Sequence, residues 1–131
     1  MTRILWIEDE GYSDLIQYKQ PMIEAGYVVD VAETASEAFD FLESLDYNVY
    51  IVDLILPQEG AFEGQIDFPG VEIIKKMIDH YKINPNTIIV FTVVDDKEVY
   101  NSIRSCGVKK IFLKRFQDIE FLKNEVDEIL S

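Results

Sequence analysis

The chain has 131 residues, of which 48% are apolar and 28% are charged. This length is typical of one compact domain, and the apolar fraction is too high for a disordered chain. The 12 basic and 25 acidic side chains give a formal net charge of −13, which would repel nucleic-acid phosphates and anionic lipid. We therefore expect neither nucleic acid nor a membrane surface among the partners of this chain.

A single cysteine, Cys106, excludes a disulfide framework and a zinc site of the multi-cysteine type. The N-terminal residues include Glu8, Asp9 and Glu10, where a signal peptide would have an apolar stretch. No apolar run is long enough to span a membrane. These features predict a soluble protein of the reducing cytoplasm.

Short runs of strand-forming residues alternate with amphipathic helical patterns five times along the chain. The strands are expected at 3–7, 27–31, 49–52, 87–92 and 110–113. Four of these runs are nearly unbroken apolar sequences, as in parallel strands that are covered on both faces. This order predicts an α/β fold of the flavodoxin-like type: a single-domain, doubly wound, five-stranded parallel sheet with helices on both faces.

The helical patterns carry start and stop signals. The first helix is expected over 12–25, where Pro21 should cause a kink because proline has no N–H to donate. Thr34 and Glu37 form the pattern of a capping box before the second helix. Asp95 and Gly107 are placed to begin and to end the fourth helix. The fifth helix has apolar residues at helical spacing: Ile119, Leu122, Val126 and Ile129.

The segment 54–69, between the third strand and its helix, has no helical period. Loops of this length are uncommon in compact domains and are often functional. Three large apolar side chains, Phe62, Ile66 and Phe68, favour a segment that packs against the domain or a partner and partly covers the end of the third strand. A surface insertion without a role is the alternative.

Polar residues follow the predicted strands at the edge where a doubly wound sheet binds ligands. Carboxylates gathered at such an edge are typical ligands of Mg²⁺. An aspartate can accept a phosphoryl group, a threonine hydroxyl can hydrogen-bond its oxygens, and a lysine can neutralise its charge. The candidates are Glu8 and Asp9 after the first strand, Asp53 after the third, Thr92 at the end of the fourth and Lys114 after the fifth.

Over nearly its whole length the chain resembles the receiver domain of bacterial two-component response regulators, the CheY-like family. The spacings of 44 residues from Asp9 to Asp53 and of 22 residues from Thr92 to Lys114 are similar to those of the family. Four motifs in order carry the resemblance: Ile7-Glu8-Asp9-Glu10, Val52-Asp53-Leu54-Ile55-Leu56-Pro57, Thr92, and Phe112-Leu113-Lys114.

The resemblance implies a response regulatory domain over 1–131 in which Asp53 accepts a phosphoryl group from a sensor histidine kinase or a phosphotransfer protein. Thr92 and Lys114 would hold the phosphoryl oxygens. The phosphorylated form would signal to a downstream protein through the face of the fourth helix, fifth strand and fifth helix. Beyond self-phosphorylation and slow autodephosphorylation, such a domain is not an enzyme. Mg²⁺ would bind Glu8, Asp9, Asp53 and the main-chain carbonyl of Ile55.

Three residues and the length of the segment 54–69 depart from the family's pattern. Ile111 stands where an aromatic switch residue is usual, Arg115 stands where proline is usual, and Val93 is bulkier than the common small residue after the threonine. These departures favour an alternative, a receiver-like interaction module that binds a partner without phosphorylation. The complete set of acidic, hydroxyl and lysine residues favours the phosphoacceptor.

Two other classes of protein are excluded by the residues near the strand ends. A hydrolase of the haloacid-dehalogenase type needs an acid/base carboxyl two residues after its nucleophile, where Ile55 follows Asp53. A flavodoxin needs hydroxyl and glycine residues around a phosphate after the first strand, where this chain has acids. The last predicted helix ends near Ser131, and a single-domain regulator and a part of a longer protein both stay open.

Overall fold

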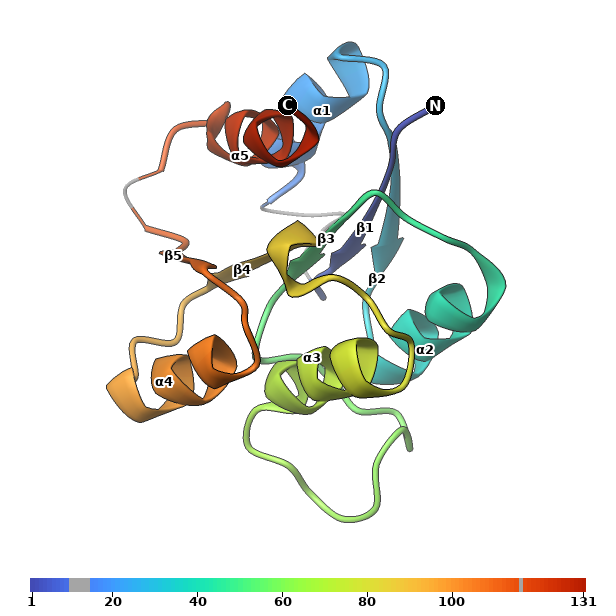
Figure 1. The fold of residues 1–131 in the computed structure, drawn as a ribbon, viewed down its shortest axis with the longest axis vertical. Helices are drawn as coiled ribbons and strands as arrows, with labels where there is room; N and C mark the ends of the chain where they lie inside the picture. The colour runs from blue at the N-terminus through green and yellow to red at the C-terminus, as the bar shows by residue number, and fades with distance from the viewer. Residues whose placement is uncertain (10–14, 116) are drawn as a thin grey trace.

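Five parallel strands form one sheet in the order β2-β1-β3-β4-β5 (Figure 1). The structure is a computed structural model that describes residues 1–9, 15–115 and 117–131. From β1 the chain adds β2 on one side of the sheet, and then adds β3, β4 and β5 on the other side. This change of side between β1 and β3 is typical of doubly wound folds. The strands are β1 (Arg3–Ile7), β2 (Val28–Ala32), β3 (Val49–Val52), β4 (Ile88–Thr92) and β5 (Lys110–Leu113).

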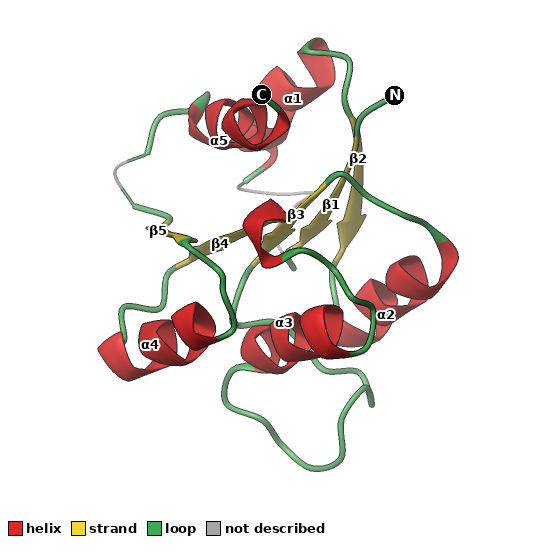
Figure 2. Cartoon of the chain, viewed as in Figure 1, coloured by secondary structure: helices red, strands yellow, loops and turns green. Residues whose placement is uncertain are grey.

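The helices cover both faces of the sheet, which confirms the predicted α/β architecture (Figure 2). One face packs against α1 and α5, and the other packs against α2, α3 and α4. A short 3₁₀ turn, η1 (Pro85–Thr87), precedes β4. The helices are α1 (Ile16–Glu24), α2 (Ala35–Ser44), α3 (Pro69–Asp79), α4 (Lys97–Ser105) and α5 (Phe121–Leu130).

The alternation of side chains along the central strands builds two separate apolar clusters. In β1, Leu5 and Ile7 point to the α2–α3–α4 face, whereas Ile4 and Trp6 point to the α1–α5 face. Every residue of β3 is buried, as expected for a central parallel strand. Because both faces of the sheet are covered, polar side chains at the strand ends are held by a rigid, apolar scaffold.

Most element boundaries agree with the sequence prediction, and the differences are local. The strands β1, β3 and β5 have the predicted bounds, whereas β2 begins one residue later and β4 begins after η1. Thr34 accepts a hydrogen bond from the N–H of Glu37 (3.1 Å), which confirms the predicted cap of α2. Gly107 has a φ of 100° directly after the C-cap residue of α4, Cys106, as predicted.

Two predictions about the helices are wrong, and a third lies partly outside the described residues. Asp96, not Asp95, caps α4 by accepting from the N–H of Val99 (3.1 Å). Ile119 precedes α5 and is 52% exposed, so it is not part of the apolar face of that helix. The predicted start of the first helix at 12–14 lies outside the described residues, and α1 continues through Pro21 to Glu24.

Residues 54–68 form an irregular loop of turns and bends that extends beyond α3 and contacts α2 (Figure 1). The N–H of Ala35 donates to the carbonyl of Pro57 (2.9 Å), and the ring of Phe62 packs edge-on against Phe39 at 5.6 Å. Within the loop, the Gln58 amide donates to the carbonyl of Gly64 (2.9 Å) and accepts from the N–H of Ile66 (2.6 Å). The loop therefore has a defined conformation.

The helix that follows the loop begins against the end of β3. The N–H of Gly70 donates to the carbonyl of Leu54 (3.1 Å). A Cβ atom on Gly70 would lie 2.1 Å from the carbonyl oxygen of Asp53, so no other residue fits there without moving the backbone. This close approach fixes the start of α3 against the peptide of Asp53.

Candidate functional site

The polar residues predicted to form a site all follow strands at the same edge of the sheet. Three of them, Glu8, Asp53 and Thr92, are 0%, 3% and 0% exposed, and they are the buried polar or charged residues of the described chain. Burying a charged or polar side chain is unfavourable unless it is paired or hydrogen-bonded. Their concentration at one edge of the sheet therefore indicates a functional site.

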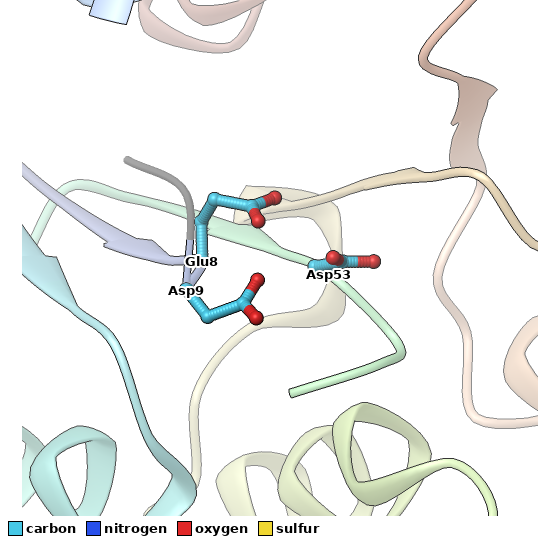
Figure 3. Close-up of side chains that lie close together, drawn as sticks. All are labelled: Glu8, Asp9 and Asp53. Carbon is cyan, nitrogen blue, oxygen red and sulfur yellow. The ribbon is translucent and has the colours of Figure 1, made fainter. Parts of the chain in front are cut away.

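Glu8, Asp9 and Asp53 bring their carboxyl groups together at the ends of β1 and β3 (Figure 3). Each offers one oxygen, and these oxygens lie within 4.8 Å of one another. Carboxylates at this separation repel one another, and oxygen ligands in such a group suit a hard divalent cation. Glu10, the fourth acidic residue of the region, lies outside the described residues.

Lys114 lies directly after β5 and contacts both buried carboxylates. Its Nζ atom is 2.6 Å from Glu8 and 2.9 Å from Asp53. Burial lowers the pKa of Lys114, but the charges and hydrogen bonds of Asp53 and Glu8 outweigh burial and raise that pKa overall. The ammonium group is therefore held in its charged form between the two carboxylates.

Glu8 is the residue whose protonation the site alters most. Burial and the charge of Asp53 raise the pKa of Glu8 and the contact with Lys114 lowers it, with a net rise from 4.5 to about 8. Without a bound cation, Glu8 therefore holds a proton more readily than an ordinary glutamate does. Such strongly shifted groups gather at functional sites more often than elsewhere.

Thr92 and Ile55 complete the strand-end edge. The hydroxyl oxygen of Thr92 accepts a hydrogen bond from the N–H of Val94 (3.2 Å), which orients the threonine at the start of the loop before α4. The N–H of Ile55 approaches a carboxylate oxygen of Asp53 at 3.4 Å. An open pocket of about 200 Å³ next to these groups is lined by Asp9, Asp53, Ile55, Val93 and Lys114.

The prediction that the segment 54–69 packs against the domain and covers the end of the third strand is only partly correct. Phe62 packs against the domain as predicted, but on α2. Of this loop, which is described throughout, only Ile55 lines the pocket beside Asp53. The prediction that the loop covers the end of the third strand is therefore wrong for this conformation, because Phe62 packs against Phe39 on α2 and not beside Asp53.

The comparisons with known proteins identify the family. Residues 4–126 match a family model described as the response regulator receiver domain. The chain belongs to this family. No curated protein matches this receiver domain. In the described parts of the chain, no helix has both the length and the apolar character needed to cross a membrane.

Solved structures of response regulators have the same fold as this receiver domain. A CheY-like receiver domain protein from Methanospirillum hungatei JF-1 is 24% identical with a TM-score of 0.74, over 99% of this chain and 97% of that chain. A two-component response regulator from Clostridium difficile is 21% identical with a TM-score of 0.77, over 99% and 96%. TrrA from Thermotoga maritima, solved in complex with Mg²⁺-BeF, is 25% identical with a TM-score of 0.72, over 98% and 99%.

The three unusual residues of this receiver domain have different surroundings. Ile111 is half-buried and packs against the apolar cluster under α2, α3 and α4. Val93 is 65% exposed at the edge of the pocket. Arg115 is exposed and pairs with Asp95 at 3.2 Å, which links the loop after β5 to the loop after β4.

Two residues near the site were missed by the sequence analysis. Gly70 approaches the backbone of Asp53, and the Pro-Gly pair at the start of α3 was the available clue. The Tyr100 hydroxyl, on α4, donates a short hydrogen bond to the carbonyl of Val94, two residues after Thr92. A contact between a helix side chain and a loop carbonyl leaves no periodic pattern, so the sequence could not reveal it.

Proposed function

We propose that this receiver domain takes part in a phosphorelay, with Asp53 as the phosphoryl acceptor. The observation that carries the proposal is the contact of Lys114 with both Asp53 and Glu8 at the edge of an open pocket. The donor would be a phosphohistidine on a sensor kinase or a phosphotransfer protein. A carboxylate oxygen of Asp53 attacks phosphorus, the bond from phosphorus to the imidazole nitrogen breaks, and the imidazole leaves with its electron pair and takes up a proton.

The remaining residues of the pocket would stabilise the transferred group. Lys114 neutralises negative charge on the phosphoryl oxygens, and the Thr92 hydroxyl donates a hydrogen bond to one of them. Glu8, Asp9, Asp53 and the carbonyl of Ile55 would hold Mg²⁺, and the converging carboxylate oxygens fit this hard cation. When bound, Mg²⁺ cancels charge between the acceptor and the phosphoryl group. The likeness to TrrA, solved with Mg²⁺-BeF, supports this assignment.

A downstream protein would bind the face of α4, β5 and α5 in the phosphorylated form. Because Ile111 replaces the usual aromatic residue, the response on this face would have to use other contacts, such as the Tyr100–Val94 hydrogen bond. The second candidate function, a receiver-like module that binds its partner without phosphorylation, is favoured by the exposed Val93 beside the pocket.

Phosphorylation by a small donor separates the two candidate functions. We expect the wild-type protein to gain one phosphoryl group from acetyl phosphate and Mg²⁺, as measured by intact mass. Asp53→Asn should abolish this gain, because the amide oxygen is a poor nucleophile, while circular dichroism shows an unchanged fold. Asp67→Asn, a matched change at an exposed loop position, should leave the gain intact. A folded wild-type protein that never gains the phosphoryl mass would favour the phosphorylation-independent module.

A further inference from the structure

A second concave surface lies between the end of the loop 54–69 and helices α3 and α4. It shares no lining residue with the pocket beside Asp53. Its volume of about 320 Å³ is at the lower end of the range of roughly 300–1,000 Å³ found for ligand sites, so it suits a few side chains. We call it the α3–α4 groove. Its apolar lining is formed by Ile66, Phe68, Val71 and Val99, all of them half-buried.

Acidic side chains surround this apolar lining. Asp67 and Glu98 are exposed, and neither forms an ion pair with another described residue. Glu72 is 3.6 Å from Lys75 on the same helix, and an exposed pair of this kind is weak and easily exchanged. The groove therefore offers negative charge around an apolar centre, within a chain whose formal net charge is −13.

The wall formed by the loop is held in place without a partner. Gln58 bridges the loop by its hydrogen bonds to Gly64 and Ile66, which fixes the position of Ile66. At the other end, the N–H of Val71 donates to the carbonyl of Phe68 (3.0 Å) in the first turn of α3. A preformed wall lowers the conformational entropy that binding must remove.

We propose that the α3–α4 groove docks a segment of a partner protein in which an aliphatic or aromatic side chain is flanked by lysine or arginine. The apolar side chain would occupy the centre, and the basic side chains would pair with Asp67 and Glu98. A second copy of this chain is disfavoured because two chains of charge −13 repel each other. The same charge disfavours nucleic acid and anionic lipid. This proposal does not depend on phosphorylation of Asp53.

Peptide titration of the full chain tests the proposal. The probes are hexapeptides acetyl-Lys-Arg-x-x-Lys-Arg-amide, with leucine, isoleucine, methionine, phenylalanine, tyrosine or tryptophan at both x positions. We expect saturable NMR shift changes at Ile66, Val71 and Val99 for at least one peptide. The same peptide with glycine at both x positions should bind about tenfold more weakly, because apolar burial is lost. Absence of saturable shifts at these residues with every peptide would overturn the proposal.

Matched double variants separate the groove from the general negative charge. Asp67→Asn with Glu98→Gln should weaken binding about tenfold, as expected for two partly screened ion pairs. Glu59→Gln with Glu63→Gln removes the same charge from exposed positions in the loop that do not line the groove, and should weaken it less than about twofold. Equal losses in both variants would overturn the proposal. The proposal would also be overturned if the protein without peptide dimerised with increasing concentration in sedimentation experiments and Val99→Lys abolished the dimer.

Discussion

The acidic pocket and the neighbouring α4–β5 side are built from different kinds of contact. We define the acidic pocket as Glu8, Asp9, Asp53 and Lys114. Glu8 and Asp53 are buried and each lies within 3 Å of the Lys114 ammonium group, whereas Asp9 is exposed. The α4–β5 side is held by apolar packing, by neutral hydrogen bonds at Val94 and by an exposed ion pair. We define it as Val93, Val94, Tyr100, Ile111 and Arg115.

This difference sets the size of the effects that substitutions should have. Charges in a buried setting interact strongly and depend on every partner, so one change in the acidic pocket alters the whole group. Contacts on the α4–β5 side are individually weak, with exposed ion pairs at about 0–1 kcal/mol and neutral hydrogen bonds at about 1 kcal/mol. The acidic residues and the lysine that resemble the family's pattern lie in the first region, and the three residues that depart from it lie in the second.

The largest effect is expected for Lys114→Ala. Loss of the ammonium group leaves Glu8 and Asp53 without their shared partner and removes a charge that would stabilise the transferred phosphoryl group. The rate of phosphoryl uptake from acetyl phosphate should fall by about 100- to 1,000-fold. Lys110→Ala is the control, since that lysine pairs with Glu125 and Glu128 on α5, and its rate should stay within about twofold. Equal rates in both variants would contradict a role for Lys114.

The pH dependence of stability should report on Glu8. Its pKa in the folded protein is about 8, above the ordinary value of 4.5, so the folded state holds a proton that the unfolded state releases. The free energy of unfolding without Mg²⁺ should therefore fall as pH rises from about 4.5, and the loss should be complete above about 8, on the order of a few kcal/mol. Glu8→Gln should flatten this slope in urea unfolding curves, whereas Glu59→Gln should keep it.

Mg²⁺ should stabilise the protein by binding the folded state. A ligand present at about 100 times its dissociation constant adds about 2.7 kcal/mol to the free energy of unfolding. The gain in melting temperature should grow as pH rises towards 8, because the cation competes with the proton on Glu8. Asp9→Ala should reduce this gain and raise the stability of the Mg²⁺-free protein, since it removes one of three mutually repelling carboxylates. A gain that is unchanged in Asp9→Ala would place the cation elsewhere.

The smallest effect is expected for Tyr100→Phe on the α4–β5 side. Loss of the hydroxyl removes the hydrogen bond to the carbonyl of Val94 and should lower the free energy of unfolding by about 0.5–1.5 kcal/mol. Phosphoryl uptake should stay within about twofold of wild type, because no charge in the acidic pocket changes. A large loss of uptake in this variant would show that the two regions are not separable.

The sequence predicted the positions that depend on local pattern and on strand order. Asp53 and Lys114 could be placed at one edge because the strands before them are parallel, and the structure brings the two side chains into contact. The cap of α4 was assigned to Asp95 because Glu98 lies three residues later, as in a capping box, whereas the backbone places Asp96 at the cap.

Contacts between segments that lie far apart in the chain could not be predicted from the sequence. The direction of the loop 54–69 depends on the pairing of Phe62 with Phe39 on α2, and an apolar residue in a loop gives no indication of which surface it will meet. The contact of Lys114 with both Glu8 and Asp53 was likewise not predicted, because it depends on the register of four strands, β1, β3, β4 and β5.

The close approach of Gly70 to the peptide of Asp53 has a consequence for evolution. The loop leaves the sheet at Asp53 and re-enters the fold beside the same residue, so its two ends are fixed against each other whatever its length. Closing a flexible loop costs only about 0.6 kcal/mol more for each doubling of its length. Residues can therefore be added between these ends with little loss of stability, and a lineage can acquire a new recognition surface here while its sheet stays unchanged.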